Sequence, residues 1–155
     1  VLSEVSLLQL HGFGRYIMPI GKANRLLLRA ELGATSTDDI TALPPELRFY
    51  AGGSNSVRGY EFQSVGARDA DDEVIGGKYV ATASLEFERQ FSPDFPWAAF
   101  VDAGDAWSDG SPDIVVGAGF GIRWISPVGP VRVDLAHGFD DDSVVTLHVS
   151  AGPDL

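Results

Sequence analysis

The chain has 155 residues, 45% of them apolar, a composition typical of an ordered domain and not of a disordered tail. Its 22 acidic and 11 basic residues give a formal net charge of −11, which would repel phosphates and argues against a nucleic-acid partner. The sequence contains no cysteine, so disulfides, thiolate catalysis and thiolate metal sites are excluded.

Membrane helices are also excluded by the sequence. No segment has the roughly 18 consecutive apolar residues that such a helix needs, so a membrane-spanning form of this chain would cross with strands. The opening sequence VLSEVSLLQL lacks the basic start, apolar middle and small-residue cleavage site of a secretory signal. We therefore expect either a cytosolic protein or a chain that lacks its N-terminal part.

Apolar and polar residues alternate with a period of two in segment after segment, and this period is typical of β-strands. In one segment, for example, Leu85 and Phe87 alternate with Ser84, Glu86 and Glu88, so one face is apolar and the other carries charge. We predict an all-β, antiparallel fold with about seven strands. The predicted strands cover residues 5–18, 24–35, 77–91, 97–108, 113–126, 130–139 and 143–152.

The connections between these strands are of two alternating kinds. Those at 19–24, 92–96 and 126–130 are short and contain proline, whereas those at 35–77, 108–113 and 140–143 are acidic, and the first is long. Alternate turns of an up-and-down sheet lie on the same side, so the two ends differ chemically. Outer-membrane barrels have short periplasmic turns and longer external loops. The pattern therefore favours a barrel with external acidic loops and a periplasmic C-terminus.

Periodicity alone leaves a soluble β-sandwich open as an alternative, because its strands alternate in the same way. The strand count adds a constraint. Seven strands cannot close an antiparallel barrel, since the terminal strands would meet in parallel. Open edges are not tolerated in lipid, where backbone groups find no water. We expect the chain to be a piece of a larger barrel, or to associate with another copy through its edge strands.

Four segments in order resemble the C-terminal strands of the BamA/TamA family of outer-membrane insertases and translocases. These segments are RFYAGGSNSVRGYEF, IGGKYVATASLEFERQF, WAAFVDAGDAW and GAGFGIRWISPVGPVRVDLA. The ending LHVSAGPDL is closer to the TamA branch, since the BamA branch usually ends on an aromatic residue. The resemblance implies a transmembrane β-barrel fragment, the last seven of sixteen strands. It also implies that residues 36–76 form an external loop that folds back into the barrel lumen.

The family pattern implies that Arg58 of the motif Val57-Arg58-Gly59-Tyr60 contacts acids of the inner wall, here Glu86 and Asp102. Strand alternation independently places Glu86 on the polar face, where a carboxylate shielded from water needs a partner. A guanidinium that engages two carboxylates would fix a long loop. The residues alone favour a solvated loop position for Arg58, and the resemblance favours the buried contact. We expect the loop glycines Gly52, Gly53 and Gly59 to allow tight turns and close approach to the wall.

The implied function is non-enzymatic assembly or export of β-barrel or autotransporter-type substrates in the bacterial outer membrane. The last strand would form one side of a lateral seam, where exposed backbone groups pair with a substrate strand. The seam residues are Val145, Leu147 and Val149. The implied partners are outer-membrane lipid, nascent outer-membrane proteins, and periplasmic or inner-membrane assembly factors, with no cofactor. Alternatives are a two-partner secretion transporter, a soluble β-sandwich binding module and a barrel lipase.

Two further motifs have simpler explanations. The sequence GAGFG at 117–121 resembles part of a dinucleotide fingerprint, but it lies in a strand pattern with no following helix, so we expect glycines that face the lumen or a tight partner. The acidic run of Asp69, Asp71, Asp72 and Glu73 lacks calcium-loop spacing, which favours a solvated external loop over a calcium site. The three histidines show no ligand spacing, and no metal site is predicted.

Overall fold

The computed structural model describes residues 7–127, 129–140 and 145–152. Within them the chain forms one seven-stranded sheet in which every strand pairs antiparallel with its neighbour in sequence. This single sheet differs from the two packed sheets of a sandwich, and it confirms the predicted all-β, antiparallel class. The strands are β1 (Leu8–Ile20), β2 (Asn24–Ser36), β3 (Tyr79–Gln90), β4 (Pro96–Trp107), β5 (Val115–Ser126), β6 (Gly129–Gly138) and β7 (Thr146–Ala151).

The strand bounds differ from the predicted ones at a few points. β1 continues through Pro19 to Ile20, two residues beyond its predicted end at residue 18. Proline is tolerated there because β1 is an edge strand, where a missing N–H need not break the ladder. Val145 precedes β7 and is not part of it. Residues 5, 6, 143 and 144 of the predicted strands lie outside the described residues.

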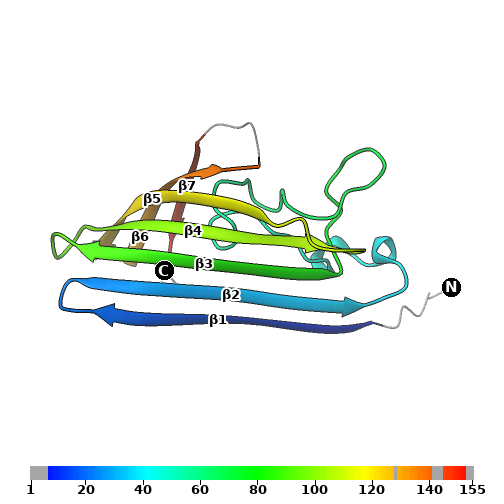
Figure 1. The fold of residues 1–155 in the computed structure, drawn as a ribbon, viewed down its shortest axis with the longest axis horizontal. Helices are drawn as coiled ribbons and strands as arrows, with labels where there is room; N and C mark the ends of the chain where they lie inside the picture. Colours follow the sequence, from blue (N-terminus) through cyan, green and yellow to red (C-terminus); the bar gives the residue numbers. More distant parts are fainter. Residues whose placement is uncertain (1–6, 128, 141–144, 153–155) are drawn as a thin grey trace.

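The sheet is curved, and the long connection between β2 and β3 lies against one of its faces (Figure 1, cyan to green). This connection includes two short 3-10 helices, η1 (Ile40–Ala42) and η2 (Pro45–Leu47). Isolated bridges then join Phe49 to Gly77 and Ala51 to Val65, so the outgoing and returning segments run side by side. We call residues 37–78 the long loop.

The long loop and the face beneath it enclose the main apolar core. Its buried members are Phe49, Ala51, Val57, Tyr60 and Val65 of the loop and Val80 and Ala106 of the sheet. The other face of the sheet carries large apolar side chains that are exposed, including Leu32, Phe120 and Leu147. We call the loop-covered face the inner face and the apolar one the outer face. Among the described residues, no helix is long and apolar enough to span a membrane.

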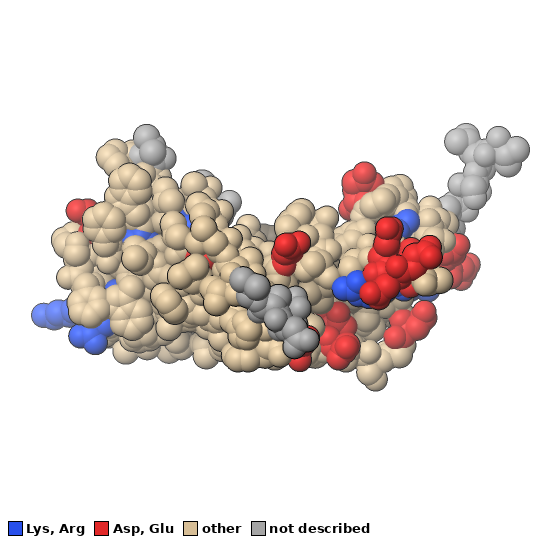
Figure 2. Space-filling view, turned by 90° about the horizontal axis from the view of Figure 1, so that it is seen from above, with Lys and Arg blue, Asp and Glu red and all other residues tan. Residues whose placement is uncertain are grey.

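The two ends of the sheet differ in charge. Figure 2 shows most acidic residues gathered at one end of the molecule, with a few basic residues among them, and further basic residues at the opposite end. The acidic end is that of the long loop and the β4–β5 connection. The exposed acids of these two connections are Asp38, Asp39, Glu46, Glu61, Asp69, Asp71, Asp72, Glu73, Asp109 and Asp113.

Candidate functional site

The side chain of Arg58 lies at the tip of the long loop and is completely buried against the inner face. Its Nε and Nη2 donate to the two carboxylate oxygens of Asp102 at 2.7 and 2.9 Å, and its backbone N–H donates to the same carboxylate at 3.0 Å. Its Nη1 donates to Glu86 at 2.5 Å. The structure therefore brings together the three residues that the resemblance paired. This bidentate geometry is the strongest form of arginine–carboxylate contact.

Two more residues of the inner face, Ser84 and Phe100, contact the Arg58 guanidinium. Its Nη2 donates to Ser84 Oγ at 3.2 Å, and its Cζ lies 3.4 Å from the centre of the Phe100 ring, in cation–π contact. Burial by itself would lower the pKa of Arg58. The hydrogen bonds and charges of Asp102 and Glu86 outweigh burial and raise that pKa above its ordinary value. Arg58 therefore remains charged in its buried position.

Sequence reasoning missed a third carboxylate and a second arginine in the same cluster. Asp134 lies 3.3 Å from Arg58 Nη1. Arg123 bridges the acids, with Nη2 at 2.7 Å from Glu86 and Nη1 at 2.5 Å from Asp134. Alternation places both side chains on the inner face, but only the pairing of β5 with β6 and the curvature of the sheet bring them beside Glu86.

The ion pairs continue across the inner face as one network. Arg123 Nε lies 3.4 Å from Glu88, which also pairs with Arg25, and Arg132 Nε lies 3.4 Å from Asp134. The network joins four arginines, Arg25, Arg58, Arg123 and Arg132, to four carboxylates, Glu86, Glu88, Asp102 and Asp134. It is therefore electrically neutral. Removing one of its buried members, such as Arg58, Glu86 or Asp102, would leave an uncompensated buried charge.

The backbone of the loop tip turns sharply at the predicted glycines. Gly52, Gly53 and Gly59 have φ angles of 96°, 104° and 99°, a region that other residues rarely adopt. The Gly53 N–H donates to the carbonyls of Val57 and Tyr60 at 3.2 and 3.1 Å, which closes the tip on itself. A β-carbon on Gly59 would lie 2.7 Å from the backbone nitrogen of Gly138. Gly59 therefore allows the tip to lie directly on the wall.

Two glycines of the inner face, Gly117 in β5 and Gly138 in β6, lie directly beneath the loop tip. A β-carbon on Gly117 would lie 1.9 Å from the Arg58 carbonyl oxygen, and one on Gly138 would lie 2.7 Å from the Tyr60 ring. Gly117 is the first residue of GAGFG, so this motif supplies a flat surface for close approach, as expected of glycines that face a tight partner. Val57 is fully buried beside the tip, and the Tyr60 hydroxyl donates to the Val116 carbonyl at 3.2 Å.

The last described strand is also tied to the loop tip. The Gly59 N–H donates to His148 Nε2 at 3.1 Å, and the Ser54 hydroxyl lies 3.3 Å from His148 Nδ1. The Thr146 hydroxyl donates to the Gly59 carbonyl at 3.4 Å. His148 gave no sequence signal beyond its place on the polar face of the strand. Its contacts connect Gly59, one residue from Arg58, to β7.

The predicted seam residues lie apart from this cluster. Leu147 and Val149 of β7 point to the outer face and are about 60% exposed, at 61% and 60%. Gly152 N–H donates to the Pro130 carbonyl, so by alternation the backbone groups of residues 150, 148 and 146 face β6. The N–H and C=O groups of Leu147 and Val149 consequently face the free edge of the sheet.

The contacts of this site hold the tip of the long loop against the inner face of the sheet. Within the described residues, no group of three or more His, Cys, Asp or Glu side chains has an arrangement that could hold a metal ion. Asp69 Oδ1 instead accepts hydrogen bonds from the backbone N–H groups of Asp71 and Glu73, at 2.9 and 3.0 Å. These bonds fold the acidic run into a turn within the long loop.

Several known proteins are similar to this chain in sequence. The family model described as the Omp85 superfamily domain matches residues 1–152. The outer membrane protein assembly factor BamA of Nitratidesulfovibrio vulgaris is 34% identical over 125 residues, which is 74% of this chain and 15% of that protein. The chloroplastic outer envelope protein 80 of Arabidopsis thaliana is 30% identical over 120 residues, 70% of this chain and 15% of that protein.

Two further matches are BamA proteins. BamA of Neisseria meningitidis serogroup B is 28% identical over 160 residues, 79% of this chain and 20% of that protein. The crystal structure of Haemophilus ducreyi BamA lacking POTRA domains 1–3 matches with a TM-score of 0.77 and 20% identity, over 94% of this chain and 35% of that one. The fold is thus that of part of the BamA barrel, and the chain spans about a fifth or less of these curated relatives. The matches do not distinguish the TamA branch from the BamA branch.

Proposed function

Since the chain belongs to the Omp85 superfamily, we propose that it is the seam-bearing part of a bacterial outer-membrane barrel that assembles or exports β-barrel or autotransporter-type polypeptides. The names of the two BamA relatives support this role, which needs neither cofactor nor chemical catalysis. The buried contact of Arg58 with Glu86 and Asp102 is the observation that carries the proposal, because it fixes the long loop inside the curved sheet.

Lipid is the proposed environment of the outer face. Alternate residues of each strand place apolar side chains such as Leu28, Leu85 and Phe120 on that face, where the structure leaves them exposed. Such a surface is unfavourable in water and favourable in hydrocarbon. The acidic end in Figure 2 is then the external end, and the short turns lie on the periplasmic side.

The long loop, residues 36–76 in the predicted bounds, then enters the barrel lumen. Arg58 holds the tip through three carboxylates, while Gly117 and Gly138 allow the backbone to approach the wall. In this proposal the loop does not move relative to the sheet. It contacts the inner face of β3, β4, β5, β6 and β7, and so sets the position of the last strand.

The free edge of β7 is the proposed site of substrate pairing. The backbone groups of Leu147 and Val149 face away from β6, so an added strand finds donors and acceptors there. In β-augmentation of this kind the main-chain hydrogen bonds give the affinity, so little side-chain specificity is needed. A protein that assembles many substrates could use this mode, because its substrates share strand structure and differ in sequence.

The test is a pair of substitutions at Val149 in the full-length protein, reconstituted in lipid vesicles with an unfolded outer-membrane barrel as substrate. Val149→Pro removes one free-edge N–H but no hydrogen bond to β6, and an edge strand tolerates proline. Val149→Thr changes the same side chain and keeps the N–H. We expect slower substrate folding with proline and near-normal folding with threonine, measured as heat-modifiable gel mobility of the substrate. Equal rates for both variants would count against pairing at this edge.

A further inference from the structure

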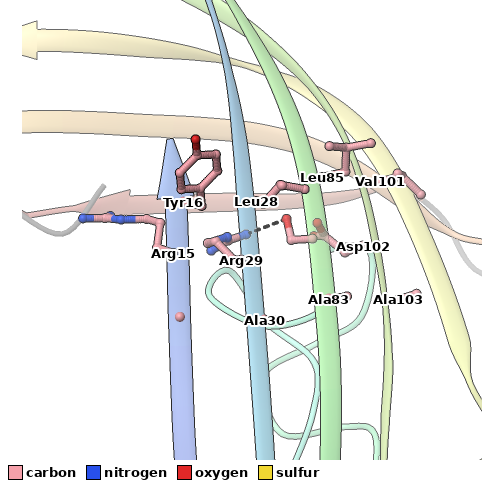
Figure 3. Close-up of a pocket in the computed structure, with 12 residues that line it drawn as sticks. Arg15, Tyr16, Leu28, Arg29, Ala30, Ala83, Leu85, Val101, Asp102 and Ala103 are labelled. Atoms are coloured by element: carbon pink, nitrogen blue, oxygen red, sulfur yellow. Dashed lines mark hydrogen bonds between the residues drawn. The ribbon is translucent and has the colours of Figure 1, made fainter. Parts of the chain in front are cut away.

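The outer face of the sheet is apolar along most of its length. Figure 3 shows Tyr16, Leu28, Leu85 and Val101 in a row across β1 to β4, where they are partners in register. By alternation, a single Lys or Arg lies on this face among the described strand residues, and it is Arg89 near the end of β3. Arg89 is about 13 Å from the Leu85 row along the strand. This cation therefore lies at the border of the apolar surface, at the end of the short turns.

Aromatic side chains lie beside Arg89 at this border. Its Cζ is 5.2 Å from the centre of the Phe91 ring, and the Phe91 and Trp97 rings stack with their centres 6.0 Å apart. Trp97 is also the cross-strand neighbour of Arg89, and its ring centre is 6.2 Å from that of Phe87. Within the described residues, the buried indole N–H of Trp97 has no acceptor. Aromatic residues at strand ends of outer-membrane barrels lie at the level of the lipid headgroups.

The charge of Arg89 is not neutralised by the protein. In the described part of the chain, Arg89 is exposed and forms no ion pair, and the same holds for Lys22 in the β1–β2 turn. This turn lies beside the end of β3, because the Gln90 N–H donates to the Ala23 carbonyl at 2.8 Å. Two unpaired cations thus occur at the same end of the sheet.

The acids at this end of the described structure do not compensate these two cations. Glu88 lies on the inner face, where it pairs with Arg25 and Arg123. Asp94 is exposed in the β3–β4 turn and forms no ion pair. The unpaired cations therefore outnumber the unpaired acid, which agrees with the basic residues that Figure 2 shows opposite the acidic end.

We propose that Arg89 and Lys22 bind the phosphate of one net-anionic phospholipid in the periplasmic leaflet, whose acyl chains lie on the apolar outer face. A phospholipid carries an anion and hydrocarbon chains in one molecule, and this border presents cations beside an apolar surface. A guanidinium binds phosphate oxygens through two parallel hydrogen bonds, and an ammonium adds a point charge. The site rests on the membrane orientation in the proposed function, and it adds a specific lipid ligand that the assembly role does not require.

Photo-cross-linking in membranes tests this site in the full-length protein. The protein is reconstituted in phosphatidylcholine vesicles with a minor fraction of phosphatidylglycerol that carries a photoreactive diazirine in its headgroup. After illumination, proteolysis and mass spectrometry locate the lipid adducts. The variants are Arg89→Gln and, as matched control, Arg68→Gln, because Arg68 is an exposed arginine in the long loop at the opposite end. Heat-modifiable mobility verifies that both variants are folded.

We expect adducts concentrated in residues 87–97, about fivefold fewer of them with Arg89→Gln, and no change with Arg68→Gln, since one cation near an anionic surface changes the affinity by about that factor. Lys22→Gln combined with Arg89→Gln should lower the yield further. Unlabelled phosphatidylglycerol should displace the probe, and inorganic phosphate should not.

Equal displacement by inorganic phosphate would identify a free-anion site and overturn the lipid assignment. Adducts that do not decrease with Arg89→Gln, or that spread evenly over both ends of the strands, would overturn the site and leave the proposed function standing. A folded, reconstituted protein with no adducts on any strand would overturn the membrane environment on which both proposals depend.

Discussion

The carbonyl oxygen of Arg58 occupies the space that a side chain on Gly117 would need. A β-carbon at Gly117 would lie 1.9 Å from that oxygen, far inside van der Waals contact. The neighbouring atom belongs to backbone, so a flexible side chain cannot move aside to make room. The loop tip can therefore lie against β5 only because residue 117 is a glycine and has no β-carbon.

Gly117→Ala should therefore displace the loop tip. We expect a clear loss of thermal stability and greater protease sensitivity within residues 48–62 of the full-length protein. The matched control is Gly14→Ala on the outer face of β1, because a β-carbon there would meet nothing within 4 Å. The measurements are limited proteolysis and the temperature of the heat-modifiable gel shift. Similar behaviour of the two variants would contradict the close fit.

Arg58→Ala should release the loop more completely. The substitution leaves Glu86, Asp102 and Asp134 short of a buried counter-charge, and breaking such a pair costs roughly 3–5 kcal/mol. We expect rapid proteolysis of the loop and a lower unfolding temperature. Arg68→Ala, in the exposed outer part of the same loop, is the control. Unchanged protease sensitivity of the Arg58 variant would argue against a locking role.

Arg58→Lys separates charge from geometry at the same position. Lysine keeps the positive charge but cannot make the bidentate contact with Asp102 together with the contact to Glu86. We expect an intermediate protease sensitivity, between those of the native protein and Arg58→Ala. Full stability of the lysine variant would show that charge alone holds the tip.

His148→Ala should loosen the attachment of β7 to the loop. The Gly59 N–H would lose its acceptor, and an unsatisfied buried donor costs about 1–3 kcal/mol. Residues 1–155 contain no cysteine, so in a full-length protein whose other cysteines are replaced by serine, spin labels at Phe62→Cys and Leu147→Cys report the loop-to-strand distance selectively. We expect a broader distance distribution from double electron–electron resonance. A distribution as narrow as that of the His148-containing protein would show that the histidine does not hold β7.

Single cysteines also test the proposed orientation. Ser111→Cys in the β4–β5 connection should react with a membrane-impermeant maleimide from outside intact cells, because that connection belongs to the acidic, external end. Lys22→Cys in the β1–β2 turn should react only after permeabilisation. The opposite pattern would reverse the topology.

Much of this architecture was predictable from alternation. The polar face of the strand at 77–91 identified Glu86 as an inward acid in need of a partner, and the resemblance supplied Arg58 and Asp102. Asp134 and Arg123 were visible as inward residues but not as neighbours of Glu86. Alternation gives the face of a residue, whereas its neighbours depend on register and on the curvature of the sheet.

His148 and the wall glycines were harder to predict for a different reason. Their roles arise where the loop tip meets the sheet, and nothing local in LHVS or GAGFG determines where a loop some 90 or 60 residues earlier will lie. The first predicted strand ended at residue 18, whereas β1 continues through Pro19 to Ile20. The edge position of β1, a property of the whole sheet, makes it acceptable.

The short length of β7 determines where the sheet would open first. Six residues of β7 pair with β6, whereas thirteen pairs join β1 to β2. Backbone amides of a short terminal strand exchange with solvent through smaller and cheaper local openings than those of long strands. Deuterium uptake should therefore begin in β7 and spread to β6, and it should slow at His148, where the loop tip holds the strand.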